Sequence, residues 1–83
     1  MEMKELTAVK KYDTSQKCWE DTSANNELGG RLVMVNPEAV EAIEDVIVNL
    51  STHMTYVYLS SGLIYMVIEG IESVDAILRG NSI

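Results

Sequence analysis

The sequence is poor in the residues on which small secreted and metal-binding proteins depend. It contains one cysteine, Cys18, and one histidine, His53, among 83 residues. A single cysteine excludes an internal disulfide, which favours a reducing cytoplasm over a secreted setting. Zinc sites usually take three or four Cys and His ligands at short spacings, and two such residues 35 positions apart do not form that pattern. We therefore expect no metal site and no cofactor.

Signatures of catalysis and of phosphate binding are also missing. Gly29 and Gly30 mark a turn, and no Gly-rich phosphate loop occurs anywhere in the chain. Cys18 and His53 are a formal nucleophile and base, but no reactive-site pattern surrounds either of them. We expect no catalytic residues and a protein that is not an enzyme.

Long apolar runs and positive charge are scarce as well. The opening residues, MEMKELTAVKKY, contain no apolar run long enough for a signal peptide, and nothing approaches the ~20 residues of a membrane span. These features predict a cytoplasmic protein that does not enter a membrane. The formal net charge is −7, the opposite sign from that required to neutralise nucleic-acid phosphates. An acidic body favours solubility and basic protein partners instead.

The first half of the chain predicts two strands separated by a loop. Residues 4–12 alternate apolar and charged positions, and their lysines are typical of an edge strand. Residues 13–30 are polar and rich in turn-forming residues, which predicts a long loop. The short apolar run at residues 31–36 is consistent with a buried strand.

Residues 37–50 leave two interpretations open. Asn36, Pro37 and Glu38 form a typical helix start, and the apolar residues that follow recur at helical spacing. Taken alone, this favours a helix to Leu50, although the many β-branched residues favour a strand.

Residues 54–69 predict a β-hairpin. A two-residue turn at Ser61-Gly62 fixes which residues face one another. One side is almost wholly apolar and is the expected core face; its pairs are Leu59 with Ile64, Val57 with Met66, and Thr55 with Ile68. The other side holds three of the four tyrosines; its pairs are Tyr58 with Tyr65, Tyr56 with Val67, and Met54 with Glu69.

Two surfaces are therefore candidate contacts. Tyrosines on a solvent-facing sheet side are common at interfaces, so Tyr56, Tyr58, Tyr65 and Val67 form a candidate partner or dimer interface. Ordinary cross-strand pairing under a covering element explains the same residues without any partner. Trp19, in the predicted loop, is a candidate contact or stacking residue together with Arg31, unless its ring folds back onto the small core.

The chain closes with a predicted helix over residues 71–79. Ile71, Val74, Ile77 and Leu78 make one apolar stripe, and Gly80 is a natural helix stop. The stripe should cover the core face of the hairpin. The predicted fold is a single mainly β (α+β) domain spanning residues 1–83, a small antiparallel sheet of four or five strands with one C-terminal helix. Domains this small often gain stability by oligomerising, which here predicts a homodimer.

Three segments together resemble the small FlbD-like family, which includes a flagellar regulatory protein and many short phage proteins. They are Leu6-Thr7-Ala8, VNPEAVEAIE at 35–44, and VYLSSGLIYMVIEGIESVDAIL at 57–78. The resemblance implies a turn near 37–41 and a strand from about 42 to 48, in place of the helix. The long segment 13–30, the longer stretch between Glu44 and Thr55, and Gly70 in place of a Ser are departures that make the chain more similar to the phage members.

The functional expectation follows from both lines of argument. The leading hypothesis is a non-enzymatic, phage-type accessory protein that binds and modulates a host protein, such as a component of host defence. A second hypothesis is a sponge for a signalling nucleotide, which would stack a base on Trp19 or a tyrosine and hold phosphate through Arg31 or the N-terminal lysines. A third is a regulatory or assembly role like that of the flagellar relative.

Overall fold

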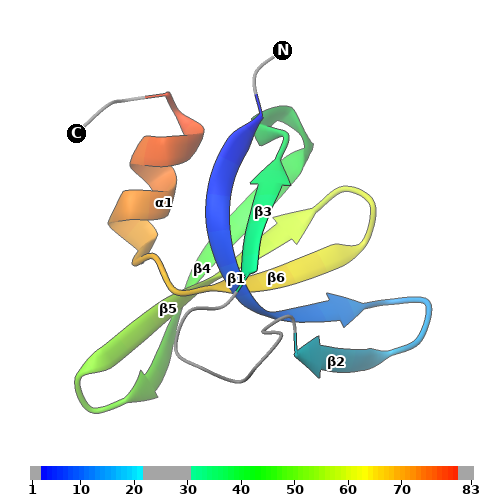
Figure 1. Cartoon of the computed structure of the whole chain (residues 1–83), viewed down its shortest axis with the longest axis horizontal. Helices are drawn as coiled ribbons and strands as arrows, with labels where there is room; N and C mark the ends of the chain where they lie inside the picture. Colours follow the sequence, from blue (N-terminus) through cyan, green and yellow to red (C-terminus); the bar gives the residue numbers. More distant parts are fainter. Residues whose placement is uncertain (1–2, 22–30, 81–83) are drawn as a thin grey trace.

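The computed structural model describes residues 3–21 and 31–80 and is mainly β, as predicted. A curled antiparallel sheet is followed by one C-terminal helix (Figure 1). The elements in chain order are β1 (Lys4–Asp13), β2 (Cys18–Asp21), β3 (Arg31–Val35), the short 3₁₀ helix η1 (Pro37–Ala39), β4 (Val40–Asn49), β5 (Thr52–Leu59), β6 (Leu63–Val67) and α1 (Ile71–Leu78).

The strands lie in the order β2-β1-β6-β5-β4, and β3 also pairs with β1. Ala8 pairs with both Arg31 and Val67, and Lys10 pairs with both Asp21 and Met66. Since β6 occupies one edge of β1, both β2 and β3 must lie along the other edge. Both run antiparallel to β1, β3 beside its first half and β2 beside its second half, so together they occupy one strand position in the sheet (Figure 1).

Strand β1 is internal, and the prediction of an edge strand is wrong. Its lysines do not prevent pairing on both edges. A bulge at Val9 shifts the register between Ala8 and Lys10, so that Lys10 is turned away from the core. Leu6 and Ala8 point into the core, whereas Lys10 and Tyr12 point to the opposite face. A strictly alternating pattern does not foresee that change of face.

The first-half loop and the strand after it also differ from expectation. Cys18–Asp21 is a strand inside the segment predicted as loop, because it pairs with the second half of β1. The rest of that predicted loop, residues 22–30, lies outside the described residues. The strand predicted at 31–36 is present as β3, but it lies at the sheet margin and only Val35 is buried.

The turn-plus-strand interpretation of residues 37–50 is confirmed, and the full helix is wrong. Asn36 caps η1, where its Oδ1 accepts a hydrogen bond from the amide of Glu38 at 3.0 Å. The helix stops after three residues, and Val40 begins a strand that pairs with β5 along its whole length. Cross-strand pairing of the β-branched residues therefore outweighs the helix-start signal.

The β5–β6 hairpin forms, but its predicted register is wrong by one residue. Three residues, Ser60 to Gly62, connect the strands, and Gly62 adopts a φ of +97° that suits the glycine of a three-residue loop. Val57 consequently pairs with Tyr65, and Tyr58 pairs with Ile64. A shift of one residue turns every side chain of β6 to the other face. Tyr65 and Val67 lie on the core face, while Ile64 and Met66 lie on the opposite face, beside Tyr58 and Tyr56.

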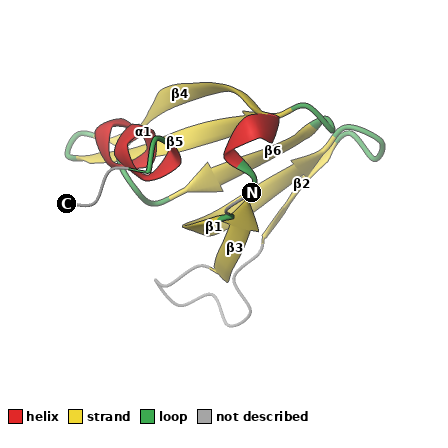
Figure 2. Cartoon of the chain, turned by 90° about the horizontal axis from the view of Figure 1, so that it is seen from above, coloured by secondary structure: helices red, strands yellow, loops and turns green. Residues whose placement is uncertain are grey.

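The core lies between the curled sheet and α1 (Figure 2). The predicted helix and its covering role are confirmed, since α1 buries Val74 completely against the sheet. Buried Thr55 donates its hydroxyl hydrogen bond to the carbonyl of Glu69 at 2.7 Å, which ties the segment between β6 and α1 to the middle of β5. The buried apolar residues that form the core are Leu6, Ala8, Val35, Val57, Val67 and Val74. No helix in the described part of the chain is long and apolar enough to cross a membrane.

Candidate partner-binding surface

The face of the sheet opposite the core carries a continuous set of large side chains, which we call the aromatic face. It comprises Tyr12, Trp19, Tyr56, Tyr58, Ile64 and Met66. Strand pairing arranges this face in two neighbouring rows that run across the strands. The first row is Trp19, Tyr12, Ile64, Tyr58 and Ala42, and the second is Lys10, Met66, Tyr56 and Glu44.

The four aromatic rings form an unbroken chain of contacts. The centroid of Trp19 lies 5.2 Å from that of Tyr12 and 5.4 Å from that of Tyr56, with the latter pair stacked at 26°. Tyr56 in turn meets Tyr58 edge-on at 6.2 Å. Trp19 is on β2 and Tyr56 is on β5, and strands β1 and β6 lie between them. The two side chains must therefore extend toward each other across these two strands. The stacked pair thereby spans β1 and β6.

The β1–β2 turn sets the position of Trp19. Asp13 Oδ1 accepts hydrogen bonds from the amide of Ser15 at 2.9 Å and from its hydroxyl at 2.7 Å. These hydrogen bonds from Ser15 lower the pKa of Asp13, because they stabilise the ionised carboxylate. Lys17 completes the turn with a positive φ of 57°, and β2 then pairs Trp19 directly with Tyr12.

A charge-assisted hydrogen bond fixes the other end of the aromatic face. The hydroxyl of Tyr58 donates to Glu44 Oε1 at 2.6 Å, within the range typical of strong O–H···O⁻ bonds. This bond to Glu44, with desolvation as a smaller cause, raises the pKa of Tyr58 to about 12. The phenol therefore remains a neutral donor well above neutral pH, and the carboxylate of Glu44 borders the surface.

The structure regroups the predicted contact residues. Tyr56 and Tyr58 lie on one face as expected, and Trp19, predicted as a separate loop contact, joins them by stacking on Tyr56. The prediction that Tyr65 and Val67 share this face is wrong, because the hairpin register places both on the core side. The Trp19 side chain is 41% exposed, so the alternative in which it folds back onto the core is also wrong.

Tyr12 was not singled out from the sequence. The bulge at Val9 brings it onto the aromatic face, and only its pairing with Trp19 reveals the connection. Arg31 is placed elsewhere: it pairs with Ala8, four positions along β1 from the partner of Trp19, which is roughly 13 Å along the strand. The structure therefore does not bring Trp19 and Arg31 together as one stacking and phosphate site.

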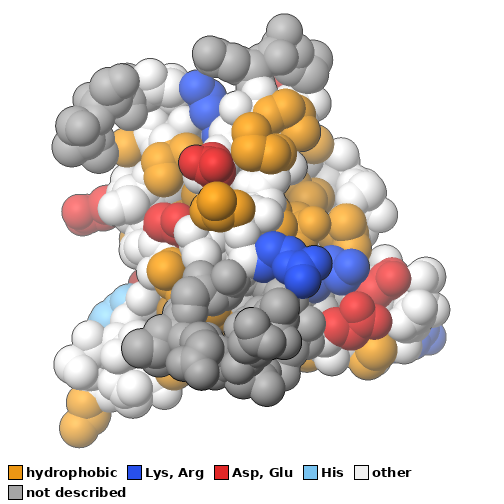
Figure 3. Space-filling view, viewed as in Figure 1, with side chains coloured by type: hydrophobic (Ala, Val, Ile, Leu, Met, Phe, Trp, Pro, Cys, Tyr) orange, Lys and Arg blue, Asp and Glu red, His pale blue; other side chains and the backbone are white. Residues whose placement is uncertain are grey.

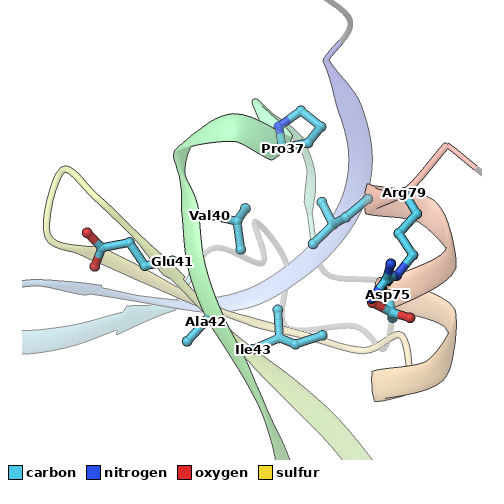
Figure 4. A pocket seen from close by; sticks show the side chains of 8 residues that line it. Pro37, Val40, Glu41, Ala42, Ile43, Asp75 and Arg79 are labelled. Atoms are coloured by element: carbon cyan, nitrogen blue, oxygen red, sulfur yellow. Dashed lines mark hydrogen bonds and ion pairs between the residues drawn. The ribbon is translucent and has the colours of Figure 1, made fainter.

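Hollows also lie outside the aromatic face. A groove of about 370 Å³ lies between the start of β4 and α1, where Pro37 and Val40 face the helix (Figure 4). Two of its charged side chains bond to each other, since Arg79 Nε donates to Asp75 Oδ1 at 2.8 Å. A second hollow of about 420 Å³ lies beside His53 at the start of α1, where the ring contacts Asp45 at 3.1 Å.

The residues that offered formal chemistry are kept apart. Cys18 is exposed, and its sulfur lies 4.0 Å from the side-chain oxygen of Gln16, whereas His53 contacts Asp45 at the far end of β5. Over residues 3–21 and 31–80, the structure contains no group of three Cys, His, Asp or Glu side chains placed to hold a metal ion. The aromatic face is thus the most developed surface feature of the described chain.

Comparison with known proteins adds no relative to this picture, since no protein-family model, curated protein or solved structure matches the chain.

Proposed function

We propose that this protein acts by binding a partner protein through the aromatic face, without catalysing a reaction. The single observation that carries the proposal is the chain of four rings that includes Trp19, which is 41% exposed and stacked on Tyr56. Tryptophan and tyrosine are enriched among the residues that dominate binding energy, because they bury a large area at a low cost in side-chain entropy. Rings already held by one another lose little further freedom on binding.

The charges support a basic partner. The chain has a formal net charge of −7, and Glu44 borders the aromatic face next to Tyr58. A positive patch on the partner would speed association and select against acidic proteins. The resemblance to the phage members of the FlbD-like family adds the setting: the partner is a host protein in the cytoplasm, and binding modulates its activity.

A matched pair of double variants tests the proposal in a pull-down from bacterial lysate. Trp19→Ala with Tyr56→Ala removes the stacked pair, whereas Leu32→Ala with Met34→Ala removes two exposed apolar side chains from β3, where hydrophobic side chains also lie at the surface (Figure 3). We expect a specific partner that the natural chain and the β3 variant retain and the aromatic variant loses. Retention of nothing at low and high salt, or equal loss with both variants, would contradict the proposal.

A second candidate function is the binding of a nucleotide on the exposed side of Trp19. The observation in its favour is Lys10, which lies on the same face two positions from Tyr12 and can meet a phosphate. Thermal unfolding with a panel of cyclic and linear nucleotides distinguishes the two candidates. A rise in melting temperature that Trp19→Ala abolishes would favour the nucleotide, and the absence of any shift would eliminate it.

A further inference from the structure

Strand β4 offers a second interaction surface, which we call the β4 edge. The strand is ten residues long and stands last in the strand order, so one side of its backbone has no strand partner among the described residues. It forms the outer margin of the sheet, and the hairpin that it makes with β5 projects away from the body of the molecule (Figures 1 and 2). Free backbone donors and acceptors along such an edge are a template for another strand.

Most of the usual devices that block edge pairing are missing from the middle of β4. Natural edges are protected by lysine, proline, bulges, shortness or charged side chains, and of these the middle of β4 has only charge, in the acids Glu44 and Asp45. Residues 40–49 contain neither lysine nor proline, and the register shifts only near the two ends, between Val40 and Ala42 and between Ile47 and Asn49. The six residues from Ala42 to Ile47 therefore pair regularly and leave a regular edge.

The side chains along this stretch repeat one pattern on both faces. On the aromatic face the order is Ala42, Glu44, Val46, and on the core side it is Ile43, Asp45, Ile47. Each face therefore presents an acid between two apolar residues. Ile47 is 68% exposed and continues into the apolar tip of the hairpin at the lower left of Figure 3, so an added strand would also remove apolar area from water.

We propose that the β4 edge accepts an extended segment of a partner protein that has two adjacent basic residues flanked by apolar ones. In antiparallel pairing, the basic residues lie opposite Glu44 and Asp45, and opposite charges directly across a strand pair attract. A second copy of the chain does not fit. Symmetric antiparallel pairing of two β4 edges centred on this stretch places Glu44 opposite Glu44 of the second copy, or Asp45 opposite Asp45, and like charges in that position repel.

The test uses two labelled peptides and fluorescence anisotropy. One peptide is Val-Thr-Lys-Arg-Val-Thr, whose central pair meets the acids in the register described above, and the other carries Glu-Glu in place of Lys-Arg. We expect the natural chain to bind the basic peptide on the order of tenfold more tightly than the acidic one, since two attractive pairs replace two repulsive pairs. Protection of the amides of residues 42–47 from hydrogen exchange should accompany binding.

A charge swap in the protein makes the test specific to the edge. Glu44→Lys with Asp45→Lys should reverse the preference and bind the acidic peptide. Glu38→Lys with Glu72→Lys changes the net charge equally at exposed positions off the edge and should keep the original preference. Trp19→Ala should leave peptide binding unchanged, which separates this proposal from the proposed function of the aromatic face.

Several results would overturn the proposal. Failure of the natural chain to bind the basic peptide would do so. An equal effect of the two charge-swap variants would also do so, because the preference for the basic peptide would then come from the net charge of the protein and not from the β4 edge. A dimer in sedimentation that the edge variant dissociates would show that a second copy occupies β4. If circular dichroism shows that the edge variant is unfolded, the test depends on the natural chain alone. Its relative affinity for the two peptides and the protection of its amides at residues 42–47 then decide the outcome.

Discussion

The two faces of the sheet are built from different residues and differ in how far they are buried. The core face presents small aliphatic side chains that are wholly buried, among them Val57 and Val67, under the helix residue Val74. The aromatic face presents rings that contact one another and leave Trp19 partly in water. Aliphatic burial stabilises the fold in proportion to the area removed from water. The rings add directional contacts through which they hold one another in place. Substitution on the core face should therefore cost stability, and substitution on the aromatic face should cost mainly binding.

The most severe test of this division places the same charge at two adjacent positions of the chain. Val67→Asp puts a carboxylate at a position with no exposed surface, whereas Ile68→Asp puts one at a side chain that is 40% exposed. We expect Val67→Asp to lower the free energy of unfolding by more than about 4 kcal/mol, which is enough to unfold a domain with a thin stability margin. Ile68→Asp should cost about 1 kcal/mol or less. Circular dichroism and urea titration measure both.

This pair of variants also tests the hairpin register. If the two-residue turn expected from the sequence were correct, Ile68 would be the core residue and Val67 the outer one. A larger loss with Ile68→Asp than with Val67→Asp would therefore reject the three-residue connection through Gly62. Both variants add one negative charge, so a difference between them cannot come from net charge.

A double-mutant cycle measures how strongly the aromatic face holds itself together. Trp19→Ala and Tyr56→Ala should show a coupling of about 0.5–1.5 kcal/mol in the free energy of unfolding, the range for aromatic pairs beyond their burial. Trp19→Ala and Met34→Ala form the control cycle. The β1 partners of these two residues lie seven positions apart, roughly 20 Å, so their effects should add within about 0.5 kcal/mol. Equal coupling in both cycles would show that the stacked pair makes no specific contribution.

Local patterns predicted the elements well. The apolar stripe of 71–79, the two β-rich runs of the hairpin and the Asn36 cap each depend on neighbours in the sequence, and each is present. Segment 37–50 shows how two local signals compete. The cap supports only one helical turn, and pairing with β5 then imposes the strand.

Two of the failures share a physical cause: each depends on one residue more or less in a strand or in the connection between strands. Hydrophobic alternation has the same form for a two-residue and a three-residue loop, yet the choice decides whether Tyr65 faces the core. The bulge at Val9 likewise decides where Tyr12 points. The stack of Trp19 on Tyr56 joins residues 37 positions apart in the sequence, and no local pattern records such a contact. The sequence therefore predicted Trp19 and the tyrosines as two separate contacts, and the fold brings them together on one face.

The smallest expected effect concerns the boundary between the aromatic face and the charged margin of β4. Because its hydroxyl donates to the carboxylate of Glu44, Tyr58 has a pKa raised to about 12, against an ordinary value of 10.0. The protonated phenol is favoured in the folded state, so this bond stabilises the fold fully below pH 10. The contribution is lost as the pH rises from 10 to about 12, where the unfolded chain gives up its proton first.

Absorbance of the phenolate during an alkaline titration should show one late-titrating tyrosine in the natural chain. Tyr58→Phe should remove that late component, and Glu44→Gln should return it toward pH 10, because a neutral amide no longer favours the protonated phenol so strongly. An unchanged titration in Glu44→Gln would show that the hydroxyl and the carboxylate are not bonded in solution. Tyr58 would then be held on the aromatic face by strand pairing and by its contact with Tyr56, without help from Glu44.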